Sequence, residues 1–210
     1  MNRSDVQDLK NPARLFLQWD GKNGGFTHFD KTKGEKGEKV RVELPLKFLV
    51  LDTLSTIKGY NAKEKVGFWS NEIRDISKDI LVVRTKSGVS AKGTYTEVSS
   101  HKNCKGIKFC QSVYIATKIE DNSIIANIQM MGAALSSWIN FGKKENLLKD
   151  GIEVSGMING KTGDTEYKIP VFEKFIVSEE ADQKAKEMAK ELKEYLNAYF
   201  KVKQEENSKV

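Results

Sequence analysis

The sequence has little cysteine, histidine and proline, and it has no long apolar segment. Its 210 residues include two cysteines, two histidines and three prolines. Two cysteines are too few for a disulfide scaffold and fit a reducing compartment, so we expect a cytoplasmic protein. Two histidines exclude a three-histidine metal site. No run reaches the roughly 18 apolar residues that a transmembrane helix requires, and the polar residues 1–5 predict no secretory signal.

The composition that remains is typical of a folded domain with unevenly distributed charge. Hydrophobic residues make up 39% and charged residues 30%, which provides enough apolar content for a core. The formal net charge is +6, and residues 84–108 contain six Lys or Arg and one acid. Such a basic cluster attracts polyanions, nucleic acids among them. The alternative is a solvated, lysine-rich loop that binds nothing.

Short apolar or alternating segments, separated by turn residues, predict about ten β-strands ahead of one long helix. The strand candidates are residues 14–19, 26–29, 40–44, 46–51, 80–83, 109–119, 124–130, 152–158 and 166–176, with a short aromatic run at 67–70 and a short helix at 132–141. We therefore expect a flexible arm over residues 1–13 and a mainly β domain over residues 14–177. The simplest matching architecture is a five-stranded Greek-key barrel with elaborated loops, and a β-sandwich gives a similar pattern.

The C-terminal region predicts an amphipathic helix over residues 178–202, followed by a polar tail over residues 203–210. Ser178 is a suitable N-cap, and the two glutamates after it lie where the helix dipole favours negative charge. Apolar residues recur every three or four positions and form one stripe: Ala181, Ala185, Met188, Leu192, Tyr195 and Tyr199. Two interpretations stay open. The stripe packs on the protein's own sheet, or residues 179–200 form the seam of a homo-oligomer.

One glycine-rich segment resembles a phosphate-binding loop but departs from its pattern. Residues 156–162 have three residues between the two glycines where the pattern has four, and a strand follows where a helix is required. A hairpin turn at Asn159 and Gly160 explains this segment better.

The sequence offers no strong catalytic motif. His101, Cys104 and Cys110 could seed a zinc site, but no fourth ligand lies nearby and no Cys-x-x-Cys pair exists. No Gly-x-Ser-x-Gly nucleophile elbow occurs, and the acidic residues are scattered. A Cys–His nucleophile and a nucleic-acid enzyme are the remaining catalytic alternatives, without local support. We predict a protein that is not an enzyme and needs no cofactor or metal.

Aromatic residues lie beside cations in several segments, as single-stranded nucleic acid binding requires. Bases stack on aromatic rings whatever the sequence, while Lys and Arg contact the phosphates. The stacking candidates are Trp19, Phe29, Trp69 and Tyr95. The phosphate-contacting candidates, expected in flexible loops, are Lys31, Lys33, Lys36, Arg84, Lys86, Lys92, Lys102 and Lys105. Four further rings are expected in the core: Phe16, Phe48, Tyr114 and Phe172.

Four segments carry a resemblance to the single-stranded DNA-binding proteins of tailed bacteriophages. They are residues 13–19 (ARLFLQW), 48–52 (FLVLD), 67–72 (GFWSNE) and 127–135, which include NIQM and GAAL. The resemblance implies an OB-like barrel, the fold that binds oligonucleotides, in a replication or recombination accessory without a catalytic centre. One departure is the C-terminus, which is only weakly acidic and has no terminal aromatic residue, so recruitment of replication proteins through such a tail is in doubt.

Together these observations predict binding of single-stranded DNA without sequence specificity, in DNA replication or recombination of the phage type. A viral protein of this kind would act in the host cell cytoplasm. The alternative is a non-enzymatic interaction module of β structure that oligomerises through its C-terminal helix. No membrane partner is expected.

Overall fold

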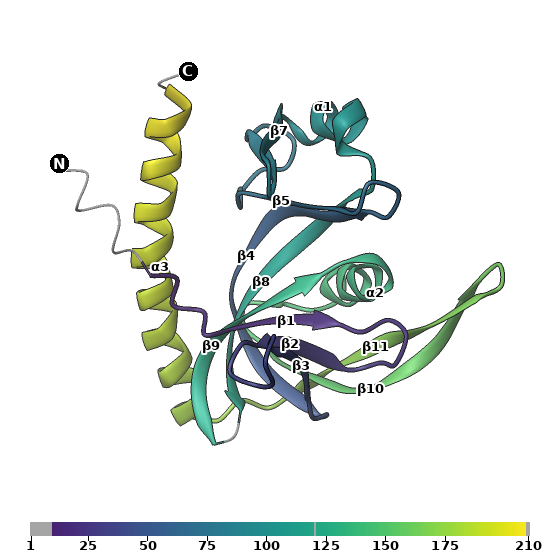
Figure 1. The fold of residues 1–210 in the computed structure, drawn as a ribbon. Coiled ribbons are helices and arrows are strands. Elements are labelled where there is room, and N and C mark those ends of the chain that lie inside the picture. Colours follow the sequence, from purple (N-terminus) through teal and green to yellow (C-terminus); the bar gives the residue numbers. More distant parts are fainter. Residues whose placement is uncertain (1–9, 120, 209–210) are drawn as a thin grey trace.

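The computed structural model describes residues 10–119 and 121–208, and within them the chain is mainly β, as the sequence predicts (Figure 1). The strands are β1 (Leu15–Trp19), β2 (Phe26–Asp30), β3 (Glu38–Val42), β4 (Leu46–Asn61), β5 (Val66–Ser70), β6 (Leu81–Thr85), β7 (Gly88–Gly93), β8 (Ile107–Ile119), β9 (Asn122–Met130), β10 (Gly151–Thr162) and β11 (Thr165–Phe175). The helices are α1 (Tyr95–Ser100), the 3₁₀ turn η2 (Lys102–Cys104), α2 (Gly132–Gly142) and α3 (Glu179–Ser208).

All eleven strands belong to one mixed sheet. Its main path runs β3-β2-β1-β9-β8-β4-β5-β6-β7, and β10 joins it at β4 and carries β11. Among these ladders β1–β9 is parallel and the others are antiparallel. No ladder among the described residues joins the edge strand β3 or β11 to close the sheet. The observed architecture is therefore an open sheet, larger than the five-stranded barrel that the sequence predicts.

The long pair β4–β8 connects two halves of the molecule. β8 pairs with β4 from Phe48 opposite Thr117 to Gly59 opposite Ile107. The first part of β4 also pairs with β10, and its last part pairs with β5. Strand β4 thus belongs to two parts of the molecule (Figure 1). One is a lower body, built on β1–β3 and β9–β11, and the other is an upper lobe, built on β5–β7.

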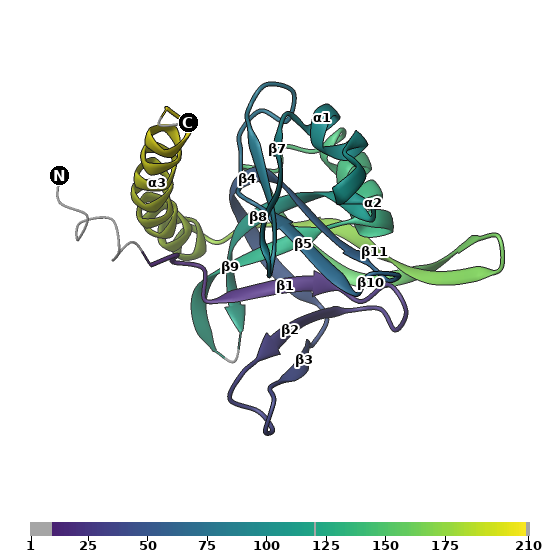
Figure 2. The same ribbon diagram turned by 45° about the horizontal axis from the view of Figure 1, so that its top comes forward.

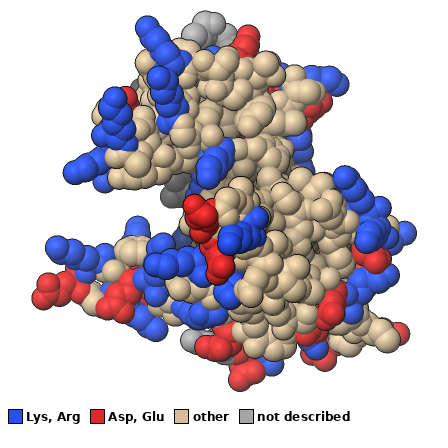
Figure 3. Space-filling view, turned by 90° about the vertical axis from the view of Figure 1, so that its right-hand side faces the viewer, with Lys and Arg blue, Asp and Glu red and all other residues tan. Residues whose placement is uncertain are grey.

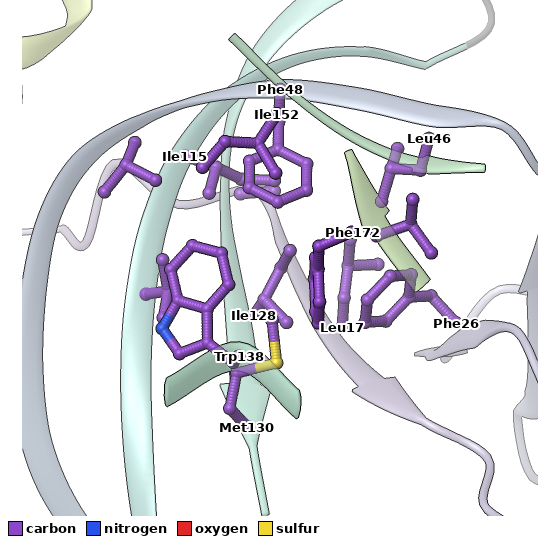
Figure 4. Close-up of a cluster of buried hydrophobic side chains, with 14 of the residues drawn as sticks. Leu17, Phe26, Leu46, Phe48, Ile115, Ile128, Met130, Trp138, Ile152 and Phe172 are labelled. Atoms are coloured by element: carbon purple, nitrogen blue, oxygen red, sulfur yellow. The ribbon is translucent and has the colours of Figure 1, made fainter. Parts of the chain in front are cut away.

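The lower body has the larger core. Residues at alternate positions of β1, β4, β8, β9 and β10 point into it, as expected for strands with one buried face. Helix α2 covers this core with Trp138, whose ring lies 5.2 Å from that of Phe172 (Figure 4). Phe48, Tyr114 and Phe172 are buried, as predicted, whereas Phe16 is exposed and that prediction is wrong.

The upper lobe has a separate, smaller core under β5–β7 and α1. It contains Phe68, Leu81, Val83 and Val98. The basic segment 84–108 folds on this core as the β6–β7 hairpin, α1, η2 and the start of β8, so it is not the flexible loop expected from its lysines. A capping box between Thr94 and Glu97 starts α1.

Helix α3 packs its apolar stripe on the protein's own sheet, the first of the two interpretations. Leu192 and Leu196 are buried against Leu54, Tyr114 and Ile125. The helix lies beside the sheet in both ribbon views (Figures 1 and 2). It continues to Ser208, so residues 203–208 of the predicted tail are helical.

Three further predictions concern the N-terminal arm, one hairpin turn and membrane-spanning segments. Residues 1–9 of the predicted arm lie outside the described residues, and residues 10–13 form no helix or strand. Asn159 and Gly160 lie inside β10, so the predicted turn there is wrong; the chain reverses at Gly163 and Asp164, where Gly163 has a φ of 57°. Among the described helices, none has the length and apolarity to cross a membrane.

Candidate nucleic-acid groove

A groove separates the lower body from the upper lobe. It consists of two adjoining hollows of about 620 Å³ each, which share Gln18, Lys58 and Trp69. The first is lined mainly by β1, β2, β4, β5 and α3, and the second by β4, β5 and the start of β8. Figure 3 shows a hollow between the upper and lower parts of the molecule, with Lys and Arg side chains on both sides of its mouth.

Strand alternation in β1 decides which side chains face the groove. Leu15, Leu17 and Trp19 pack on the core of the lower body. Phe16 and Gln18 point to the other face and line the groove. Gly24 and Gly25 both have a positive φ in the turn after β1, which brings β2 back alongside the groove.

A row of cations and one ring crosses the sheet on the groove side. Arg84 of β6 is paired with Trp69 of β5, Trp69 with Lys58 of β4, and Lys58 with Lys108 of β8. Directly paired residues share a sheet face, so these four side chains lie side by side. Lys92 is paired with Val82, whose neighbours Leu81 and Val83 are buried, and it therefore lies on the same outer face.

Four aromatic side chains of the groove are exposed to solvent. The exposed fractions are 44% for Phe16, 56% for Phe29, 59% for Tyr60 and 41% for Trp69. Four strands thus present rings to one channel: Phe16 lies on β1, Phe29 on β2, Tyr60 on β4 and Trp69 on β5. The ring of Phe29 lies across Gly37, where a Cβ atom would collide with it. Exposed rings that face one channel are available to stack on planar ligands.

The centre of the groove holds a cluster of hydrogen-bonded polar side chains. Gln129 Oε1 accepts a hydrogen bond from Gln18 Nε2 at 2.8 Å and another from Lys58 Nζ. Beneath them, the Glu72 carboxylate accepts hydrogen bonds from the hydroxyl groups of Ser112 and Tyr114, the latter at 2.8 Å. This cluster fixes the side chains at the floor, where the two hollows meet.

Burial changes the ionisation of two groups in this cluster. It raises the pKa of Glu72, and the hydroxyl groups of Ser112 and Tyr114 only partly oppose the rise. Burial also lowers the pKa of Lys58. Glu72 is the one acidic residue among the described residues that line the two hollows, whereas Arg14, Lys31 and Lys39 add positive charge. The groove is therefore electropositive and suited to a polyanion.

Helix α3 forms the rear wall of the first hollow. Tyr195 and Tyr199 line it, and the Tyr199 hydroxyl accepts a hydrogen bond from the backbone N–H of Glu72 at 2.9 Å. Arg74 forms a two-pronged ion pair with Asp52, with distances of 2.5 and 2.7 Å, and lies over the ring of Phe200. These contacts join the helix to the loop that carries Glu72.

The predicted site residues divide into three groups. Phe29, Lys31 and Trp69 line the groove, and Arg84 and Lys92 share the outer face of Trp69. Lys33, Lys36 and Lys86 are exposed in the turns beside it. The remaining four do not line it: Trp19 packs on the core and donates to Lys168 O at 2.9 Å, Tyr95 packs on Phe109, and Lys102 and Lys105 lie in and after η2.

The sequence-based prediction misses several residues that line the groove, among them Phe16, Lys58, Tyr60 and Lys108. Gln18 gave a usable signal for Phe16, since residues two apart on a strand share a face and a glutamine favours the solvent side. Lys58 and Tyr60 continue the strand from Leu46, and the same alternation would have placed them together. Nothing local in the sequence pairs them with Trp69.

The cysteines and histidines do not form a cluster. Cys104 and Cys110 are buried free thiols, and burial raises the pKa of both, that of Cys110 to about 12. His101 Nδ1 accepts a hydrogen bond from the backbone N–H of Asn103 at 3.3 Å. No group of three potential metal ligands occurs in the described part of the chain. Because their pKa values are raised, the two thiols are poor nucleophiles at neutral pH.

The geometry defines this site as an electropositive groove with exposed aromatic rings. No protein-family model matches the chain, and comparison with curated proteins and with solved structures gives no match. The groove itself is thus the basis for a functional conclusion.

Proposed function

We propose that the protein binds single-stranded DNA, without requiring a particular sequence, along the groove between the lower body and the upper lobe. The observation that carries this proposal is one channel lined by the exposed rings of Phe16, Phe29, Tyr60 and Trp69, together with the exposed cations Lys31, Lys39 and Lys108. Rings stack on bases of any identity, and cations release the counterions of the phosphates. Unstacked bases are exposed in single strands, so a duplex is the poorer ligand.

The order of strands and helices supports a further proposal, that the fold is related to an OB-like barrel. Strands β4, β8, β9, β10 and β11, with α2 between β9 and β10, follow the element order of an OB-like Greek-key barrel. In this view β1–β3 and β5–β7 are the elaborations that build the two sides of the groove. The ladders leave this barrel open, so the relation is proposed from element order.

We place the activity in DNA replication or recombination, where single strands are exposed and need a protein that coats them. Phage-type replication in a host cytoplasm is the setting that the sequence resemblance favours. The described residues contain no metal cluster, and the groove holds one carboxylate, Glu72, beside the hydroxyl groups of Ser112 and Tyr114. We propose that the protein coats single strands, with replication proteins as further partners.

The test is fluorescence anisotropy with a labelled oligothymidine and a duplex of the same length, at several salt concentrations. We expect preferential binding of the single strand, weakening as salt rises, with quenching of tryptophan fluorescence. Absence of binding at low salt would refute the proposal.

A variant pair locates the site. Trp69→Ala should weaken oligothymidine binding by roughly 1–3 kcal/mol, the contribution of one stacked base, and should leave the salt dependence unchanged. Trp19→Phe is the matched control, because Trp19 packs on the core and donates its N–H to Lys168 O. It should lower stability and leave affinity unchanged. Equal affinity of Trp69→Ala and the wild type would remove Trp69 from the site.

A further inference from the structure

The hydrogen bonds at the groove centre fix the orientation of two amide groups. The Lys58 ammonium has only donors, so the Gln129 atom that it contacts must be the oxygen, Oε1. Gln18 approaches the same oxygen at 2.8 Å, and its contacting atom must therefore be the donor Nε2. The amide orientation of both glutamines follows from the charge of Lys58.

This orientation leaves one acceptor and at least one donor for a ligand. No described residue donates to Gln18 Oε1, and this oxygen is not fully enclosed: the fully enclosed side-chain atoms without a partner are His28 Nδ1 and Asn127 Oδ1. Lys58 forms no ion pair with a described carboxylate and contacts one acceptor, so further N–H groups stay free. Because Lys58 and Gln18 share one oxygen, these donors lie beside the free acceptor.

The position of Trp69 determines which part of a nucleotide contacts Lys58 and Gln18. Its ring is exposed, and it is the direct cross-strand neighbour of Lys58 on the same face. A base stacked on the Trp69 ring therefore has an edge directed at the floor, toward Lys58 and Gln18. A phosphate group reaches the exposed cations at the mouth more easily than it reaches Lys58, which is largely buried.

We infer that the groove centre reads the edge of one stacked base and prefers bases with an oxo group beside a ring N–H over bases with an amino group there. The oxo oxygen accepts from Lys58, and the ring N–H donates to Gln18 Oε1. Thymine, uracil, guanine and hypoxanthine present this edge; cytosine and adenine present the amino group to the Lys58 donors instead. This inference rests on the proposed function and adds a preference for a chemical class of base.

Two pairs of oligonucleotides isolate the edge from other properties. Deoxyuridine and deoxycytidine differ only in this edge, and deoxyinosine and deoxyadenosine differ in the same way among purines. With 12-nucleotide homopolymers at one salt concentration, we expect the oxo member of each pair to bind about tenfold more tightly, within the range for one bidentate base contact.

Lys58→Met should abolish the preference in both pairs, because the amide of Gln18 alone can pair with either edge. Lys108→Met is the matched control: the neighbouring cation in the same row is expected to contact phosphate, so its loss should lower affinity for all four oligonucleotides by one factor. If Lys58→Met fails to fold, the wild-type ratios still decide.

The outcomes distinguish this inference from the proposed function. Binding of all four oligonucleotides with equal affinity, or a preference for the amino members, would overturn base-edge reading and leave single-strand binding intact. A failure to bind any of them would overturn both. A preference that survives Lys58→Met would assign the reading to other residues and reject this site.

Discussion

Glu72 lies under the floor of the groove and also makes the stability of the protein depend on pH. Its carboxylate is buried under the groove floor, faces Lys58 and Asp52 electrostatically, and accepts hydrogen bonds from Ser112 and Tyr114. Burial raises its pKa above the ordinary value of 4.5. The folded state therefore holds this proton more tightly than the unfolded state, so stability is lost as the pH rises through the folded pKa.

A pH-dependent comparison tests this sign. Glu72→Gln removes the titration, so the free energy of unfolding of the variant relative to the wild type should increase as the pH rises above the ordinary glutamate pKa of 4.5. Glu97→Gln is the control with the opposite trend. Hydrogen bonds from Thr94 hold the pKa of Glu97 low, so the free energy of unfolding of the wild type relative to that variant should increase as the pH rises. Urea unfolding at several pH values measures both. A flat difference for Glu72→Gln would contradict the raised pKa.

The two faces of β1 show what single residues reveal before the fold is known. Both faces carry large apolar side chains, Leu15, Leu17 and Trp19 on one and Phe16 on the other. Hydrophobicity alone cannot say which ring faces solvent, so the sequence predicts Phe16 in the core and Trp19 in the site, and the structure reverses both. Trp69, predicted as a stacking ring because cations lie near it in the sequence, is exposed.

At the scale of elements, local patterns predict most of the chain and long-range pairing does not follow from them. The hairpin β1–β2, the helix α2 and the helix α3 lie close to their predicted positions, since their signals are turns, caps and periodicity. The parallel pair β1–β9 brings Gln18 to Gln129 across 111 residues. No local signal encodes that contact, and it builds the groove floor.

Helix α3 offers a prediction at the same scale. Leu192 is buried against Leu54, Tyr114 and Ile125, so Leu192→Ala should lower the free energy of unfolding by about 2–5 kcal/mol. Lys193→Ala, at the next, exposed position, should change it by less than about 0.5 kcal/mol. Chemical unfolding compares the two.

Light scattering on the same variants tests the oligomeric alternative. The stripe of α3 is occupied within its own chain, so Leu192→Ala should leave the molecular mass unchanged over a range of concentrations. A mass that depends on concentration and falls in Leu192→Ala, without a loss of stability, would favour an interaction module that assembles through residues 179–200.

At the scale of the whole molecule, the question is whether binding follows the groove or the overall charge. The net charge of +6 attracts DNA everywhere on the surface, whereas the two sides of the groove bring cations from separate parts of the fold. Lys31 follows β2 on the lower body, and Arg84 lies beside Trp69 on the upper lobe. Lys102 and Lys105 carry equal charge in and after η2 and line neither hollow.

Two double variants with the same net charge separate these cases. If Lys31 and Arg84 each neutralise a phosphate, their joint replacement by Ala should reduce the slope of log affinity against log salt by about 1.4, at roughly 0.7 per contact for a single strand. Replacing Lys102 and Lys105 by Ala should change the slope much less. Equal reductions would mean that DNA responds to the whole surface, and the groove would then owe its affinity to its rings alone.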